Sequence, residues 1–414
     1  MATSNPTRTA AFEKRLKKRY AAERRFKMLG LGAILFSLLV LAILLVNMTV
    51  NGIGGFQRAE MPVTLNVAQS GLALDERTLP LQSPQSLEAS GLPLVLQEAA
   101  TQQLGADGAD HLGPQAWREV AERLIEEPAL VSQDTTFSLP TDANLAQGLA
   151  GEGSPEMQAL AQRLEADGKL ANRFDGGFLT RADATSPQLV GIWAALKGSV
   201  LTMIVTLALA FPIGVLAALY LEEFARKNRW TDLIEVSINN LAAVPSIIFG
   251  LLGLAVFLTI FPNMRSAPLI GGMTLALMTM PVIVIAGRNA IKAVPPSIRD
   301  GALAIGASPV QVAFHHVLPL ALPGILTGTI IGMARALGET APLLLIGMRA
   351  FVATPPDGFT SPATVLPVQI FLWSDEIDRG FVERTSAAII VLLAVLLLMN
   401  ALAIYLRNKF EKTW

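Results

Sequence analysis

Two oppositely charged residues lie four positions apart inside an apolar stretch of the chain. Arg335 and Glu339 are the only charged residues in the run 331–345. In a helix, residues at this spacing share one face. A charge at the centre of a membrane costs about 2.5 to 3.5 kcal/mol on insertion scales, so such residues usually face a partner or a watery path. The planar guanidinium of Arg335 suits an oxyanion, which it can hold by two parallel hydrogen bonds.

Glu339 would give such an anion site a means of selection. A carboxylate needs a hydrogen-bond donor opposite it, so it favours a protonated phosphate over a fully deprotonated anion such as sulfate. Gly332, Gly338 and Pro342 flank the pair, and we expect them to loosen the helix and free backbone groups beside the charges. The alternative is a structural ion pair that joins two spans, and these residues alone leave both interpretations open.

The composition indicates a membrane protein. Of the 414 residues, 52% are hydrophobic and 16% are charged, and the apolar residues gather in blocks of the roughly 20 residues that a helix needs to cross a bilayer. We predict an all-α membrane protein with six spans, at 28–48, 196–221, 233–261, 269–287, 324–347 and 387–406. The first span is expected to be retained rather than cleaved as a signal peptide. The absence of Cys excludes disulfides and thiol catalysis, and three His leave little material for a metal site.

The positions of Lys and Arg predict the orientation, because basic residues at span ends resist translocation. Seven of them lie between 15 and 27, which predicts a cytoplasmic N-terminus (1–27) before the first transmembrane helix (28–50). Alternation then places the C-terminus in the cytoplasm and the segment 51–195 outside. Between 51 and 185 that segment holds 19 Asp and Glu against 8 Lys and Arg. It is long enough for a small domain, mainly helical or mixed, with amphipathic helices predicted at 114–130 and 155–170. The membrane part follows at 196–410.

The predicted cytoplasmic loop 299–319 is rich in small residues. Gly301, Ala302, Gly306 and Ala307 would let a short helix turn sharply and let a partner approach its backbone, while Asp300 can cap the start of the helix. An ordinary connection between two spans is the alternative.

The end of this loop is expected to set how the chain re-enters the membrane. Pro319 should stop the loop helix. The apolar residues before it are expected to form a face that docks in a groove of a partner; they are Val310, Val312, Phe314 and Val317.

The loop resembles the coupling loop of ABC importer permeases. Its residues Asp300, Gly301 and Ala302 fall on the Glu-Ala-Ala opening of the family pattern, Gly306 falls on its glycine, and His316, Leu318 and Pro319 fall on its closing Ile-x-Leu-Pro element. The chain departs from that pattern by Asp for Glu, Gly for Ala and His for Ile. The resemblance implies that the loop docks on an ATPase subunit.

The run 335–344, Arg-Ala-Leu-Gly-Glu-Thr-Ala-Pro-Leu-Leu, resembles the PstA-type permeases of phosphate ABC importers, and the similarity extends over about 196–405. It implies a permease subunit of the bacterial inner membrane that moves inorganic phosphate from the periplasm to the cytoplasm, with Arg335, Glu339 and Thr340 in the substrate pathway. Many relatives carry an arginine near the position of Ile285. Arg288, one turn further on, either takes that role or is an anchor at the cytoplasmic surface.

The same resemblance implies the partners: a PstC-like second permease, PstB-like ATPase subunits and a PstS-like periplasmic phosphate-binding protein. No cofactor is expected on this chain, and ATP and Mg²⁺ would bind the partner ATPase, because the sequence has no phosphate-binding Gly-x-x-x-x-Gly-Lys-Ser/Thr motif. No nucleic acid is expected. Hinge candidates are Pro245, Gly338 and Pro342.

Other functions stay open at this point. Within the same class, the chain could carry molybdate or sulfate. From a different class, it could be a membrane sensor whose outer segment binds a ligand, although the longest internal stretch, about 36 residues, is short for an output domain. A membrane-embedded enzyme is less favoured, because the sequence lacks a cluster of paired acids or His.

Overall fold

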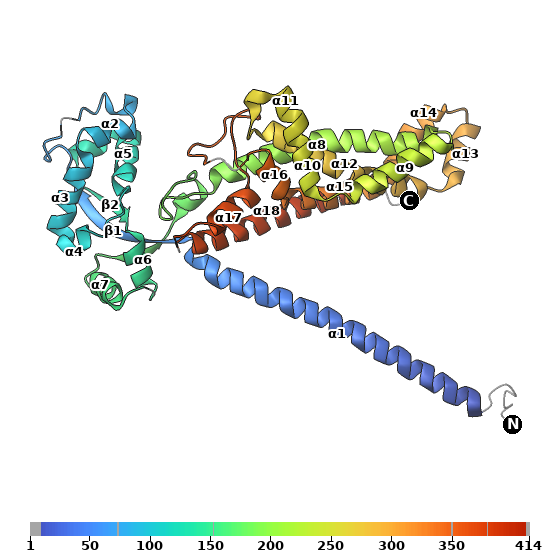
Figure 1. Cartoon of the computed structure of the whole chain (residues 1–414), viewed down its shortest axis with the longest axis horizontal. Helices are drawn as coiled ribbons and strands as arrows, with labels where there is room; N and C mark the ends of the chain where they lie inside the picture. The colour runs from blue at the N-terminus through green and yellow to red at the C-terminus, as the bar shows by residue number, and fades with distance from the viewer. Residues whose placement is uncertain (1–9, 73, 152, 349–350, 379, 411–414) are drawn as a thin grey trace. The chain divides into compact units, whose positions relative to one another are not determined.

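The computed structural model describes residues 10–72, 74–151, 153–348, 351–378 and 380–410 (Figure 1). The chain divides into two units, Met1–Asn51 and Gly52–Trp414. The described part of the first unit belongs to α1 (Ala10–Gly54), a helix of 45 residues. Its stretch Lys14–Gly54 is long and apolar enough to cross a membrane.

Four further helical stretches in the described residues meet the same test: Trp193–Phe224, Pro268–Lys292, Pro309–Leu337 and Gly380–Lys409. They contain α8 (Trp193–Leu219), α12 (Pro268–Lys292), α15 (Leu318–Leu337) and α18 (Gly380–Phe410). A sixth span is present if one bent pair counts as one, since Arg229–Ala242 and Ser246–Ile260 meet at 104°. The predicted helical membrane fold is confirmed, with its third span bent.

The bent span consists of α9 (Arg229–Ala242), α10 (Ser246–Leu252), a π-helical turn η5 (Gly253–Phe257) and α11 (Leu258–Ile260). Helix α17 (Leu366–Ser374) precedes α18 and packs against it and against α8. With nine residues, α17 is too short to cross a bilayer, and the sequence analysis did not predict it.

Helix α12 lies between α8 and α15 in the membrane bundle (Figure 1). Three glycines of α15, each four residues from the next, bring the backbones of α15 and α12 together. A Cβ at Gly328 would lie 2.0 Å from the Cβ of Ala286, and one at Gly332 would lie 2.9 Å from Cγ2 of Thr279. Gly324 makes the same kind of contact. Small residues at this spacing are typical of close helix pairs in membranes. The expectation that Gly332 loosens the helix was therefore wrong, because it serves packing.

The segment 51–195, which the charge pattern predicts to lie outside and which is called the external fold below, forms a mixed α/β fold around a small antiparallel sheet. Strands β1 (Gln57–Leu65), β2 (Thr135–Pro140) and β3 (Ala171–Phe174) lie in the order β2-β1-β3, with Val63 opposite Phe137. The helices are α2 (Pro84–Ala89), α3 (Leu92–Leu104), α4 (Ala106–Ala109), α5 (Ala116–Glu126), α6 (Ala143–Leu149) and α7 (Pro155–Ala166). Short 3₁₀ turns are η1 (Leu79–Leu81), η2 (Pro128–Ser132), η3 (Gly176–Leu179) and, in the membrane part, η6 (Pro262–Met264).

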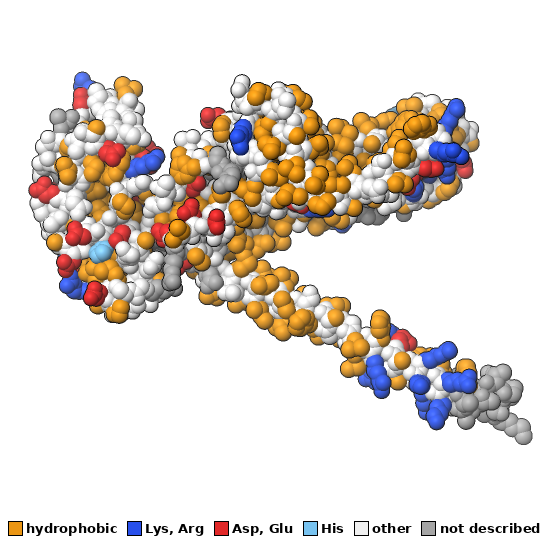
Figure 2. Space-filling model, viewed as in Figure 1, with side chains coloured by type: hydrophobic (Ala, Val, Ile, Leu, Met, Phe, Trp, Pro, Cys, Tyr) orange, Lys and Arg blue, Asp and Glu red, His pale blue; other side chains and the backbone are white. Residues whose placement is uncertain are grey.

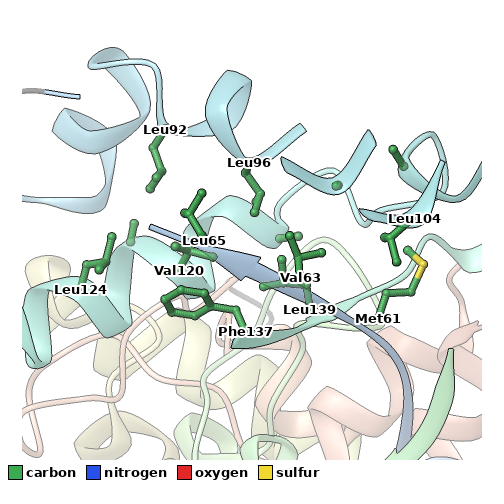
Figure 3. Close-up of a cluster of buried hydrophobic side chains, with 14 of the residues drawn as sticks. Met61, Val63, Leu65, Leu92, Leu96, Leu104, Val120, Leu124, Phe137 and Leu139 are labelled. Atoms are coloured by element: carbon green, nitrogen blue, oxygen red, sulfur yellow. The ribbon is translucent and has the colours of Figure 1, made fainter. Parts of the chain in front are cut away.

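The core of this external fold lies between the sheet and its helices (Figure 3). Met61 and Val63 of β1 are fully buried, as are Val120 and Leu124 of α5. The predicted amphipathic helices at 114–130 and 155–170 are confirmed as α5 and α7, both shorter than predicted. Burial of one apolar stripe of each helix against the sheet gives the segment a core of its own.

Arg384, at the start of α18, ties the external fold to the membrane helices. Its guanidinium donates to the carbonyl oxygens of Gly55 (2.7 Å) and Pro187 (2.8 Å) and lies 3.0 Å from a carboxylate oxygen of Asp175. Asp175 also accepts two hydrogen bonds from Arg181, at 2.8 and 2.7 Å. Both places where the chain passes between the external fold and the membrane are thus bound to α18.

Candidate substrate pathway and coupling loop

Arg335 and Glu339 lie where the fifth span breaks. Helix α15 ends at Leu337, Gly338 caps it, and α16 (Ala341–Leu345) begins after Thr340. Pro342 in the first turn of α16 has no N–H to continue the previous helix. The predicted continuous span at 324–347 was wrong at both ends, because the helix already begins at Pro309 and breaks at Gly338.

The two side chains pair with each other across this break. Nε of Arg335 lies 3.3 Å from Oε1 of Glu339, and the side chains are 48% and 18% exposed. Within the described part of the chain, Arg335 forms no ion pair with another helix. The pair therefore does not join two spans of this chain. The four N–H groups on Nη1 and Nη2 make no hydrogen bond to any described residue, so they are available to an anion.

The breaks of the third and fifth spans lie against each other. Pro245 stands at the start of α10, just after the bend, and α10 packs on α16. A Cβ at Gly250 would come within 2.6 Å of Cα of Pro342 and 2.9 Å of Cδ1 of Leu345. The hinge candidates Pro245 and Pro342 thus belong to neighbouring segments, and a movement of either segment would displace the other. Their hinge role stays a prediction.

The loop after α12 forms a short exposed helix with a sharp turn. Helix α13 (Pro296–Ala304) is followed by a turn at Gly306, whose φ of +92° lies in the left-handed region that favours glycine. Asp300 and Gly301 are exposed on α13, and Ala302 packs inward. The expectation that Asp300 caps the start of the helix was wrong, because α13 already begins at Pro296. A Cβ at Gly301 would meet nothing within 4 Å. This chain's own packing therefore does not require a small residue at 301, which leaves close approach by a partner as a reason for it.

The chain returns from this loop into the membrane as one helical stretch. Ser308 and Gln311 form a capping box at the start of α14 (Pro309–Gln311), and a π-helical turn η7 (Val312–Val317) leads into α15. The prediction that Pro319 stops the helix was wrong. A local π turn is a known way for a membrane helix to accommodate a proline. Ala307, Leu318 and Pro319 accordingly lie along this connection rather than on α13.

The apolar face predicted for docking is divided by the π turn. Val312 and Val317 are buried, at 4% and 0% exposure, whereas Val310 and Phe314 are exposed. The first two pack into the core between α12 and α15, so they were wrongly assigned to a partner surface. Lys and Arg side chains gather near α13, at one end of a largely hydrophobic bundle surface (Figure 2).

An ion-pair network holds this loop to the ends of α8 and α12. It was not predicted from the sequence. Glu222 and Glu223 lie in a π-helical turn η4 (Tyr220–Phe224) at the end of α8. Glu222 pairs with Arg288 and lies 3.5 Å from Lys292. Arg288 also contacts Glu235 at 2.7 Å, and its side chain is only 11% exposed. Two carboxylates of this chain therefore hold Arg288.

Arg299 makes the second half of the network. Its guanidinium forms hydrogen bonds of 2.8 and 3.0 Å to Glu223, and it donates to the carbonyl oxygens of Val294 (2.7 Å) and Ile291 (2.9 Å). One side chain thus joins the ends of α8 and α12 to α13. The sequence signal was the pair Glu222-Glu223 at the end of an apolar span that is predicted to be cytoplasmic, where basic residues are the rule.

The family model that matches the membrane part indicates the class of this chain. A family model described as a binding-protein-dependent transport system inner membrane component matches residues 210–412, and a domain of unknown function (DUF3333) matches residues 13–159. Among solved structures, an inward-facing conformation of the MetNI methionine ABC transporter aligns with 53% of this chain and 98% of its own, at 17% identity and a TM-score of 0.42.

Curated relatives narrow this class. The phosphate transport system permease protein PstA of Yersinia pestis is 32% identical over 216 residues, which cover 51% of this chain and 71% of that protein. PstA of Haemophilus influenzae is 32% identical over 50% of this chain and 73% of its own length. PstC of the same organism is 28% identical over 58% of this chain and 84% of its own length. The chain belongs to the family of PstA-type phosphate transport permeases.

Proposed function

We propose that this chain is a permease subunit of an ATP-driven importer that moves inorganic phosphate across the bacterial inner membrane into the cytoplasm. The observation that carries the proposal is the half-exposed Arg335 beside Glu339 at the break of α15, with its Nη donors unengaged by described residues. A charge at this position needs a partner. The relatives named as phosphate permeases identify the anion.

The chemistry of the pair fits an anion that keeps a proton. The two Nη groups of Arg335 present parallel N–H donors to two phosphate oxygens. Glu339 then accepts a hydrogen bond from a protonated phosphate oxygen, which sulfate does not have at neutral pH. Thr340, next to Glu339 at the break, adds a hydroxyl that can donate or accept. Substrate binding replaces the internal ion pair, because the phosphate takes the place of Glu339 at the guanidinium, while Glu339 keeps its negative charge and accepts the hydrogen bond from the phosphate.

Energy for the movement comes from a partner ATPase that binds ATP and Mg²⁺, with this chain contributing no covalent chemistry. The exposed face of α13 around Gly301 is the docking surface for that subunit, because a partner can approach its backbone closely. ATP binding and hydrolysis would shift the permeases between outward-open and inward-open arrangements. The second permease is PstC-like, the ATPases are PstB-like, and a PstS-like protein delivers phosphate. Both termini of this chain lie in the cytoplasm.

Phosphate uptake in cells lacking their own phosphate importers tests the proposal. We expect Arg335→Gln to lower uptake by more than about ten-fold, the size expected for loss of charged hydrogen bonds, while the complex still assembles. Arg226→Gln is the matched control, because Arg226 is exposed and its side chain has no described partner. Glu339→Gln should make sulfate a better competitor of phosphate. Normal uptake by the Arg335 variant would remove this residue from the pathway.

A further inference from the structure

Helices α8 and α18 line an apolar cavity of about 600 Å³, open on one side, that the transport cycle described above does not use. Its wall is formed by Trp193, Lys197 and Val200 of α8 together with Ile390, Ala394 and Leu398 of α18. Both helices begin on the side of the external fold. The named residues of α8 lie in the half nearest that side, as do Ile390 and Ala394 of α18, and Leu398 lies just past the middle of α18. The cavity therefore lies mainly in the outer half of the bilayer.

The dimensions of this cavity match one lipid chain. From Ile390 to Leu398 the α18 wall rises about 12 Å at 1.5 Å per residue, close to the roughly 15 Å of hydrocarbon in one leaflet. The volume lies within the range of about 300–1,000 Å³ that is usual for ligand pockets. Leu398 is 68% exposed and Val200 is 47% exposed, so within the unit Gly52–Trp414 the cavity has an open side. An acyl chain can enter it from the side.

Lys197 is the charged residue of the wall. It lies one turn into α8, is half-buried, and forms no ion pair or hydrogen bond with any described residue. A lysine at this depth extends its ammonium group towards the headgroup region. There it meets phosphate groups of lipids, which supply the missing negative charge. Trp193, at the outer end of the same wall and 43% exposed, has the position of an interfacial anchor.

We propose that this cavity is a binding site for an anionic phospholipid of the outer leaflet, with one acyl chain between α8 and α18 and the headgroup phosphate at Lys197. The apolar wall alone would not choose among lipids, because lipid tails surround the whole protein and are equally apolar. Lys197 makes the site selective, since its attraction adds to binding only where the headgroup carries net negative charge. This inference does not depend on which ion the transporter carries.

Native mass spectrometry of the purified full complex, exchanged into mixed phosphatidylglycerol and phosphatidylcholine, tests the site. We expect the unaltered complex to retain phosphatidylglycerol in preference to phosphatidylcholine. Lys197→Met keeps the side-chain length and removes the charge, and should lower the retained phosphatidylglycerol about five-fold, the size expected for one lysine at a membrane surface. Lys169→Met, a change of the same kind in the external fold, is the matched control and should leave retention unchanged.

A second variant tests the cavity itself. Ala394→Phe fills the space between the helices, and should release both lipids while the complex remains assembled. Equal phosphatidylglycerol retention by Lys197→Met and Lys169→Met would overturn the proposal. So would a photo-crosslinker at position 394 that captures a protein segment instead of lipid, because the cavity would then be a protein contact.

Discussion

Arg299 is expected to hold the coupling loop in the position from which it transmits movement, and Arg299→Gln tests this most directly. The substitution removes the hydrogen bonds to Glu223, at 2.8, 3.0 and 3.3 Å, and those to the carbonyl oxygens of Val294 and Ile291. Glutamine is shorter and uncharged, so it cannot restore these contacts. The side chain of Glu223, only 12% exposed, would then be left without its partner.

The free energy lost on removing Arg299 follows from the burial of its ion pair with Glu223. Removing one partner of a buried ion pair costs about 3 to 5 kcal/mol. Because the side chain of Arg299 is 23% exposed, water compensates part of the loss, and we expect the lower end, about 3 kcal/mol. This corresponds to a factor of about a hundred in the equilibrium between the held and the detached loop.

Hydrogen exchange on the assembled complex measures this equilibrium. The backbone amides of α13 (Pro296–Ala304) should exchange up to about a hundred-fold faster in the Arg299 variant, since they become exposed by local opening. Transport should fall relative to ATP hydrolysis, because the loop no longer moves as one body with α8 and α12. The matched control is Arg226→Gln, an identical change at an exposed arginine of the same surface.

A double variant separates the ion pair from general damage. If Arg299 and Glu223 act as a pair, adding Glu223→Gln to Arg299→Gln should cost less than the sum of the single changes, with an interaction free energy of about 0.5 to 3 kcal/mol. Additive effects, or exchange of α13 no faster than in Arg226→Gln, would refute this reasoning.

Three further predictions concern other parts of the chain. Gly306→Val should impair ATPase docking and uptake more than Gly306→Asn, because φ at this residue is +92° and a β-branched side chain is strained there; equal pull-down of the ATPase and equal uptake in both variants would contradict it. Gly328→Leu should lower the melting temperature of the complex, since a Cβ there would lie 2.0 Å from that of Ala286, whereas Gly358→Leu, where a Cβ meets nothing within 4 Å, should not. Burial raises the pKa of Asp183 above its usual 3.8, so the folded state keeps this proton to higher pH than the unfolded state and loses stability as pH rises from about 4 through the raised pKa. The difference in melting temperature between Asp183→Asn and the unaltered protein should therefore shift in favour of the variant as pH rises across that interval, and should stay constant at higher pH. A shift in favour of the unaltered protein would contradict the prediction.

The sequence was informative wherever function depends on contiguous residues. Long apolar blocks identify the spans because a bilayer demands about 20 apolar residues in a row. Arg335 and Glu339 were found because helical spacing alone puts them within reach of each other. The left-handed turn was located by Gly306, since few other residues adopt that conformation at low cost.

The sequence was least informative where a feature depends on contacts across the fold. Arg299 and Glu223 are 76 positions apart, and no local pattern shows which of several basic residues meets which acid. The 104° bend after α9 also depends on long-range packing. Pro245 predicted a break, but the direction of the chain beyond it follows from the contact of Gly250 with Pro342.

The arrangement of α12 explains how a loop at one end of the bundle can act on an arginine far along α15. The C-terminal end of α12 leads into α13 and is bound to it through Arg299. Along its length, α12 is in close contact with α15 at Gly328 and Gly332, where any relative sliding would bring backbone or methyl groups into collision. Helices α12 and α15 should therefore move as one body up to Leu337. Beyond it, the break at Gly338 is the first place where the two can separate, so a displacement begun at α13 would change the geometry between Arg335, on the moving helix, and Glu339, just past the break.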